Sequence, residues 1–287
     1  MRFASSILVA VVAALTSAAP SHASEHEGLP HYLADRGDGI LLSILGTYVR
    51  AKEFIVYPFY EYTRTSKFEY SPDELKVTGP DSSKEFFGKM VEKEFLLFFA
   101  YGLSKSLAVE LESAVHSSVD FTKSPEDNTG TPDTLKESGL GDTEMNVRYR
   151  WREETETKHE ILFFFKTEFP LQKKKTLLGT KDWNFELGTV WTKGYSFGTL
   201  SYKISAAYDR EDKKVELEEW TIDYLKRLND TWKLALSIEG DQLDEVSVIG
   251  ELQYRLGKNA MLKLNTGIGI TKKAPDWAPE IGILFRF

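Results

Sequence analysis

The last seven residues of the chain, 281–287, alternate between apolar side chains and mostly small or charged ones, and the final residue is phenylalanine. The two rows are Glu280, Gly282 and Arg286 on one side, and Ile281, Ile283, Phe285 and Phe287 on the other. Because successive side chains of a β-strand point to opposite faces, one face meets an apolar medium and the other an aqueous one. Strands of closed transmembrane β-barrels alternate in this way between lipid and lumen. Leu284 is an apolar exception in the lumen row.

Both ends of the chain predict export to an outer membrane. The aromatic terminus resembles the signal that bacterial barrel-insertion machinery reads, and Phe285 and Phe287 carry that resemblance. At the other end, Arg2 precedes an apolar run at 7–15 and a small-x-small cleavage site at 21–23. We therefore expect residues 1–23 to be a signal peptide, and the mature protein to be inserted into a Gram-negative outer membrane.

Composition excludes several other classes of protein. No later stretch offers the roughly 20 unbroken apolar residues that a membrane-spanning helix needs. The formal net charge of −8 at pH 7 argues against a nucleic-acid partner. The chain has no cysteine, so it can form neither a disulfide nor a thiolate metal site. We expect neither a cofactor nor a metal.

Twelve alternating segments predict an all-β fold, a closed antiparallel transmembrane barrel of about 12 strands within residues 51–287. The expected strands cover residues 52–63, 92–101, 105–116, 142–152, 158–169, 182–192, 195–209, 215–228, 230–239, 245–256, 259–271 and 278–287. Twelve is even, as in single-chain bacterial barrels. The connections also sort by side: tight turns at Lys193-Gly194, Asn229-Asp230 and Gly257-Lys258 alternate with longer loops such as 64–91 and 117–141.

All six tryptophans fall on the predicted lipid-facing side, where amphipathic rings form interfacial belts. We expect two membrane girdles, with Trp151, Trp191 and Trp232 near the periplasmic ends of strands and Trp183, Trp220 and Trp277 near the extracellular ends.

Residues 24–50 precede the first expected strand and form either a periplasmic segment or a segment inserted into the lumen. An additional strand at 40–49 would make the strand count odd unless 68–77 supplied a fourteenth. The sequence leaves twelve and fourteen strands open.

The predicted lumen row carries charges of both signs. Its lumen-lining members are Arg148, Arg150, Glu160, Lys166, Glu168, Glu186, Lys203, Asp223, Arg227, Glu251, Arg255 and Arg286. Buried charges must be paired or hydrated, so the interior is either a water-filled channel or a lumen crossed by salt-bridge ladders. The basic row of Arg148 and Arg150 resembles the transverse field of diffusion porins, although charge neutralisation between strands is the favoured interpretation.

A short motif, Gly139-Leu140-Gly141-Asp142, opens a predicted strand. It resembles the Gly-Leu-Gly-Asp element of a loosely defined group of outer-membrane proteins linked to transport in the phenol meta-cleavage pathway. Residues 35–39, 46–48 and 56–62 resemble N-terminal regions of the same group. The resemblance implies passage of hydrophobic or aromatic compounds and brings no catalytic residues with it.

Histidine placement argues against an enzyme. His116, Ser117 and Asp120 are the local grouping of base, nucleophile and acid, but adjacent residues on a strand face opposite sides. His159 lies on lipid-facing parity without a serine partner at that depth. We expect no catalytic residue.

The sequence therefore predicts a passive channel or transporter for small, hydrophobic or aromatic solutes. The alternatives are a closed barrel with a structural or surface-recognition role and, behind it, an outer-membrane hydrolase. The expected partners are outer-membrane lipid, lipopolysaccharide, which Lys173-Lys174-Lys175 could contact, and the barrel-insertion machinery. The solute, its selectivity and the oligomeric state are left open.

Overall fold

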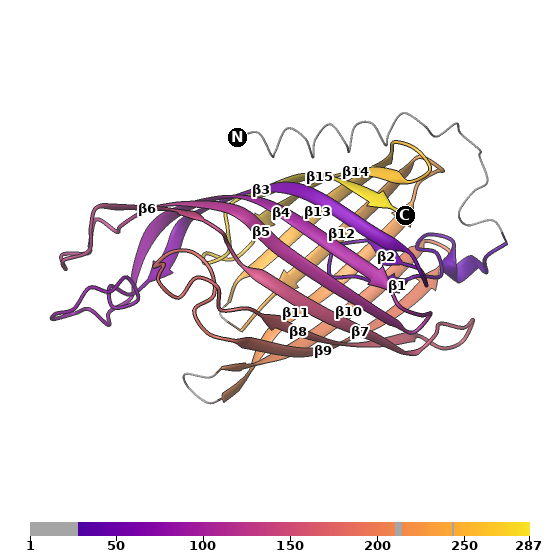
Figure 1. Cartoon of the computed structure of the whole chain (residues 1–287), viewed down its shortest axis with the longest axis horizontal. Helices are drawn as coiled ribbons and strands as arrows, with labels where there is room; N and C mark the ends of the chain where they lie inside the picture. The colour runs from indigo at the N-terminus through magenta and orange to yellow at the C-terminus, as the bar shows by residue number, and fades with distance from the viewer. Residues whose placement is uncertain (1–27, 210–213, 243) are drawn as a thin grey trace.

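Twelve strands close into an antiparallel barrel in the computed structural model, which describes residues 28–209, 214–242 and 244–287 (Figure 1). The expected signal peptide lies outside the described residues. The barrel strands are β3 (Phe54–Tyr70), β4 (Phe86–Gly102), β5 (Leu107–Thr122), β7 (Thr143–Arg152), β8 (Glu160–Glu168), β9 (Asn184–Tyr195), β10 (Gly198–Asp209), β11 (Lys214–Arg227), β12 (Trp232–Gly240), β13 (Val246–Arg255), β14 (Ala260–Gly269) and β15 (Ala278–Arg286). The last strand, β15, pairs with the first, β3, and completes the ring. The predicted fold and strand count are confirmed.

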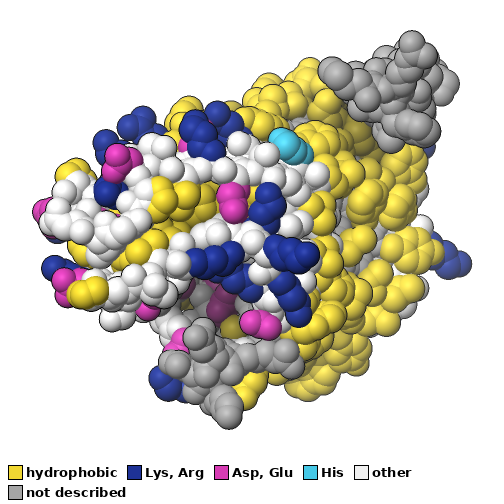
Figure 2. Space-filling view, turned by 60° about the vertical axis from the view of Figure 1, so that its left-hand side comes forward, with side chains coloured by type: hydrophobic (Ala, Val, Ile, Leu, Met, Phe, Trp, Pro, Cys, Tyr) yellow, Lys and Arg dark blue, Asp and Glu magenta, His cyan; other side chains and the backbone are white. Residues whose placement is uncertain are grey.

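The outer wall of the barrel is apolar, and hydrophobic side chains cover it (Figure 2). Large side chains such as Phe165, Leu236 and Ile268 lie exposed on this wall. A continuous apolar band of this kind is unfavourable in water and matches the lipid-facing surface of a membrane barrel. Within the described residues, no helix combines the length and the apolar character that crossing a membrane requires.

The two ends of the barrel differ. At what we call the turn end, strands are joined by short connections at 103–106, 153–159, 196–197, 228–231 and 256–259. At the opposite loop end lie the longer connections, including 71–85 and 169–183. One predicted turn is misplaced: Lys193 and Gly194 lie within β9, and the turn follows at 196–197. Gly194 is instead required by packing, because a Cβ there would lie 1.8 Å from the carbonyl oxygen of Tyr32.

Three strands, β3, β4 and β5, extend past the others at the loop end (Figure 1). They are longer than predicted, and β6 (Thr134–Gly139), which pairs with the outer part of β5, was not predicted at all. Beyond the apolar band no lipid covers the outer face of a strand, so the regular alternation of lipid-facing and lumen-facing residues is not required there. A small cluster of Tyr70, Phe86 and Phe121 packs these extensions together.

The loop at 123–133 is tied to this cluster through Asp127. The Tyr70 hydroxyl donates to the Asp127 carboxylate at 2.8 Å, and the Thr129 backbone N–H donates to the same carboxylate at 2.8 Å. Burial by itself raises the pKa of Asp127, but the hydrogen bonds from Thr129 and Tyr70 outweigh that effect and bring the pKa to about 2. The ionised carboxylate therefore stabilises this loop.

The Gly-Leu-Gly-Asp motif joins β6 to β7, both of which pair with β5. Gly139 has φ +156°, and a Cβ on Gly141 would lie 2.2 Å from the Ser117 hydroxyl oxygen. Asp142 accepts two hydrogen bonds of 2.5 Å from the backbone N–H and hydroxyl of Thr180. The glycines of the motif therefore let the chain pass close to β5 between β6 and β7, which pair with successive parts of that strand.

Residues 31–50, which we call the N-terminal segment, contain a 3₁₀ turn, η1 (His31–Leu33), and two short strands, β1 (Ile40–Leu41) and β2 (Tyr48–Val49). The two strands pair only with each other, so 40–49 adds no strand to the barrel. Residues 68–70 belong to β3 and supply no fourteenth strand.

The N-terminal segment packs on an apolar cluster inside the barrel wall. Buried members contributed by the wall include Ile55, Tyr57, Phe59, Leu96, Phe98, Leu162, Phe164, Val190, Leu225 and Leu284. Members from the segment are Ile40, Leu41, Leu42, Tyr48 and Val49. Leu284, the exception in the lumen row, therefore faces inward against protein rather than water.

Candidate functional site

The N-terminal segment fills the half of the lumen near the turn end, and Arg36 anchors it there. The Arg36 guanidinium pairs with Glu154 at 2.9 Å and with Glu160 at 3.3 Å, and its side chain is fully buried. Each carboxylate has a second cation, Lys193 at 3.2 Å from Glu154 and Arg150 at 2.9 Å from Glu160. We call these five residues the Arg36 cluster. Three cations surround two carboxylates, so each buried charge lies beside at least one of opposite sign.

A second anchor joins the segment to β5 and β7. The Ser43 hydroxyl donates to the Glu110 carboxylate at 2.6 Å. Glu110 forms an ion pair with Arg148, whose guanidinium also lies 5.2 Å from the centre of the Phe164 ring. Arg148 and Arg150 are therefore both neutralised by wall carboxylates, which leaves no unbalanced basic row along β7.

A third anchor lies on the opposite wall. The Lys263 ammonium donates to the Leu45 carbonyl and to the Thr47 hydroxyl, both at 3.0 Å, and pairs with Glu251 at 3.3 Å. Both charged side chains of that pair are fully buried. Arg286 donates to the Tyr48 carbonyl at 2.9 Å. The segment is thus held to strands on several sides of the barrel.

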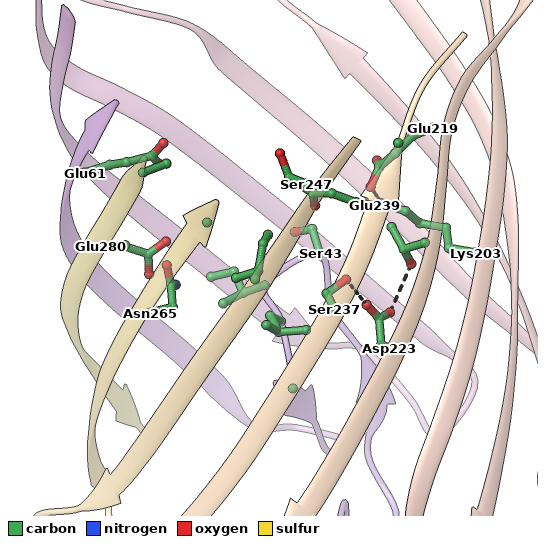
Figure 3. A pocket seen from close by; sticks show the side chains of 18 of the residues that line it. Ser43, Glu61, Lys203, Glu219, Asp223, Ser237, Glu239, Ser247, Asn265 and Glu280 are labelled. Atoms are coloured by element: carbon green, nitrogen blue, oxygen red, sulfur yellow. Dashed lines mark hydrogen bonds and ion pairs between the residues drawn. The ribbon is translucent and has the colours of Figure 1, made fainter. Parts of the chain in front are cut away.

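The half of the lumen near the loop end contains a cavity of about 800 Å³ (Figure 3). Residues 41–46 of the N-terminal segment form part of its lining, which continues along the strands to Phe68, Asp241 and Lys273 near the loop end. Figure 2 shows the loop end, where Lys and Arg side chains gather around a hollow with Asp and Glu side chains in it. The cavity therefore runs from the loop end to the N-terminal segment.

Carboxylates dominate the cavity. Eleven of its lining residues are Asp or Glu and four are Lys or Arg. Glu61 lies directly across from Glu280 on β15 and from Glu94 on β4. Figure 3 shows Glu61 and Glu280 on one side of the cavity and Glu239 and Glu219 on another. Like charges on directly opposed positions repel one another.

The cations of the cavity are already paired. Lys166 lies 3.6 Å from Glu144, 3.4 Å from Glu168 and 2.8 Å from Glu186. Lys203 pairs with Glu219 at 2.5 Å. At the loop end, burial raises the pKa of Glu245, and the negative charge of Asp241 adds to that effect.

The predicted lumen residues fall into five groups. Arg148, Lys166, Lys203 and Asp223 line the cavity. Arg150 and Glu160 belong to the Arg36 cluster, and Glu168 and Glu186 pair with Lys166; Glu251 pairs with Lys263. Arg227, Arg255 and Arg286 surround a small depression at the turn end.

Sequence reasoning did not single out Arg36, Glu154 or Glu61 as site residues. Arg36 and Glu154 lie outside the barrel strands, where alternation assigns no face. Glu61 does alternate with apolar neighbours, so its parity could have placed it in the lumen, as it does for Lys263.

The tryptophans lie at two levels on the barrel. Trp151, Trp191 and Trp232 are exposed near the turn end, and Trp183 and Trp277 are exposed at the loop end. The half-buried Trp220 is paired with Gly240, the loop-end residue of β12. At the C-terminus, Phe287 is exposed and Phe285 is half-buried.

The histidine grouping does not assemble. His116 is exposed on the outer face, whereas Ser117 is buried and donates its hydroxyl proton to Glu94 in the lumen. His159 is also exposed, in the connection before β8. Among the described residues, no group of three or more His, Asp or Glu side chains is arranged to hold a metal ion.

No family model matches the chain. No curated protein matches it either.

Solved structures share the fold at very low sequence identity. The translocator domain of the autotransporter NalP from Neisseria meningitidis is 10% identical with a TM-score of 0.50, over 83% of this chain and 90% of that chain. The toluene transporter TbuX from Ralstonia pickettii is 9% identical with a TM-score of 0.45, over 83% and 90%. Outer membrane phospholipase A from Escherichia coli is 9% identical with a TM-score of 0.44, over 89% and 97%.

The resemblance to outer-membrane β-barrel proteins is thus confirmed at the level of the fold. A shared fold does not by itself specify a function, so this likeness does not decide what the barrel does.

Proposed function

We propose that the protein is a passive channel for small solutes in an outer membrane, with access from the loop end and closure at the turn end by the N-terminal segment. The observation that carries the proposal is the cavity of about 800 Å³ that reaches from the loop end to residues 41–46. In this orientation the loop end faces outside and the turn end faces the periplasm. Phe285 and Phe287 serve as the insertion signal, and the tryptophans lie at the two membrane interfaces.

The contrast between the two halves of the lumen supports a channel. Near the turn end, the lumen is filled by apolar packing and by compensated ion pairs, as in a protein interior. Near the loop end it is left as a cavity with a polar lining. A barrel with a purely structural role gains nothing from an unfilled half, because packed side chains stabilise more than an empty space.

Closure by the N-terminal segment implies that passage requires its displacement. The segment is part of the same chain and is held by side-chain contacts rather than by covalent bonds. Displacement needs no cofactor or energy input if the open state is populated thermally. Aromatic rings near the floor of the cavity, including Tyr57 and Phe59, could contact a solute with an aromatic ring.

The absence of cysteine allows a direct test. A Cβ on Gly46 would lie 3.2 Å from the Cβ of Ala235 on β12, close to the roughly 3.5–4.5 Å that a disulfide spans. In the double variant Gly46→Cys/Ala235→Cys, the disulfide fastens the segment to the wall. We expect openings in a planar bilayer from the reduced protein and silence from the oxidised protein.

Each single cysteine variant controls for the substitution itself, including the strain at Gly46, where φ is +61°. Equal conductance in the oxidised and reduced states would show that the segment does not gate the lumen. If neither the wild type nor any of the cysteine variants conducts in the reduced state, the closed structural barrel is favoured.

A further inference from the structure

Charge compensation divides the lumen into two parts. Near the turn end, the buried ionic side chains occur in pairs or clusters of opposite sign, such as Arg36 with Glu154 and Lys263 with Glu251. In the cavity, by contrast, acidic side chains outnumber basic ones by seven. The excess is therefore confined to the space that a solute would occupy.

The cations that line the cavity do not relieve this excess. Lys166 and Lys203 already hold carboxylates, Arg148 is paired with Glu110, and Lys273 is paired with Glu69 at 2.6 Å. Six lining glutamates have no described lysine or arginine within ion-pair distance: Glu61, Glu92, Glu112, Glu218, Glu239 and Glu280. A positive ligand would offset repulsion that the protein itself leaves uncompensated.

An independent feature of the lining also indicates a ligand. Thr199 lines this cavity and is buried to about 99%, and its hydroxyl has no hydrogen-bond partner, so a polar group of a ligand would satisfy it. Two rings of the lining are occupied by cations of the chain: the Arg36 guanidinium lies 5.4 Å from the centre of the Tyr48 ring, and the Lys263 ammonium lies 5.1 Å from that of Tyr57. The charge of a ligand is therefore left to the carboxylates of the cavity.

We propose that the cavity binds and selects small organic cations, such as amines, and that these are the solutes of the channel. This inference rests on the proposed function and names its substrate class. A bare metal ion fits less well, because the described carboxylates do not converge into a group of three or more that could hold one. A volume of about 800 Å³ accommodates a small organic molecule with its water.

Three probes with the same ring separate charge from hydrophobicity: benzylammonium, benzyl alcohol and benzoate. Their equilibrium binding to the refolded full-length mature protein is measured in detergent micelles, without any need for conductance. We expect benzylammonium to bind at least about ten-fold more tightly than the other two, which corresponds to about 1.4 kcal/mol. The resemblance to transporters of aromatic compounds predicts instead that the neutral alcohol binds as well as the cation.

The variant Glu61→Gln/Glu239→Gln/Glu280→Gln removes three lumen charges without removing side-chain volume. Because it lowers repulsion between carboxylates, it is expected to fold, and to lose the preference for benzylammonium. The matched control Glu74→Gln/Glu85→Gln/Glu126→Gln makes the same change of net charge at exposed positions of the loop end and retains the preference.

Equal binding of the three probes, or a preference that survives in the lumen variant, would overturn the inference. The outcome is separate from that of the channel proposal. Selective binding by a barrel that never conducts would support the cation site and remove the channel. Conductance without any preference for cations would support the channel and remove the cation site.

Discussion

Replacing Arg36 by glutamine tests the closure of the lumen most directly, because its buried side chain connects the N-terminal segment to two carboxylates. The variant loses one contact of 2.9 Å to Glu154 and two of 3.3 Å to Glu160. Removing one partner of a buried ion pair costs about 3–5 kcal/mol when it leaves a charge uncompensated. Here Lys193 and Arg150 remain beside the two carboxylates, so no charge is left unpaired; the cost is that of the lost hydrogen bonds to charged groups, about 1.5–3 kcal/mol each, and we take about 3 kcal/mol in total.

If the free energy of the closed state rises by about 3 kcal/mol and that of the open state is unchanged, the ratio of open to closed barrels rises by about a hundred-fold. The assay is the open probability of single barrels in a planar bilayer. Arg64→Gln provides the control, because it removes the same charge at an exposed position near the loop end. An Arg36→Gln open probability equal to that of the wild type and of Arg64→Gln would refute the role of Arg36 as an anchor.

Three further predictions concern stability. Leu284→Ala is expected to lower the free energy of unfolding by about 2–5 kcal/mol, because it opens a cavity inside the barrel. Ile281→Ala on the outer wall should cost less, because lipid fills the space that it leaves. Urea unfolding in vesicles compares the two variants. Gly141→Ala is expected to cost about 1–3 kcal/mol by overpacking, and Gly257→Ala, whose Cβ meets nothing within 4 Å, should cost far less in the same assay. The pKa of Asp127 is lowered to about 2, so its stabilisation of the loop at 123–133 is complete above about pH 4 and is lost as the pH falls through 2. Protection of that loop from protease should follow this titration, and the pH dependence should be absent from Asp127→Asn.

The barrel could be predicted from the sequence because its physical cause is local. Each strand crosses the same two environments, lipid outside and polar lumen inside, so every second side chain reports its face. The alternation is lost where the chain leaves the region between lipid and lumen. In β6, Lys136 and Ser138 are exposed, and Glu137 accepts backbone hydrogen bonds from Thr176 and Leu177, so no apolar row marks the segment as a strand.

The arrangement of the lumen could not be predicted in the same way, because it depends on contacts between distant residues. Arg36 meets Glu154 and Glu160 across separations of 118 and 124 residues, and no spacing in the sequence encodes those contacts. One clue was present: Leu284 is apolar on lumen parity. Ile55, Phe98 and Leu162 are apolar on their inward faces as well.

These inward apolar residues also determine what displacement of the N-terminal segment costs. In an empty, hydrated barrel, residues such as Tyr57, Phe98 and Leu284 would expose apolar surface to water, at a cost of about 25 cal/mol for each Å². The segment buries them with its own residues Leu42 and Val49. The open state must therefore re-expose this surface or cover it with a solute that has an apolar part. An organic cation with an aromatic or aliphatic body meets both requirements of the lumen, since its charge lies among the carboxylates and its body covers the exposed wall.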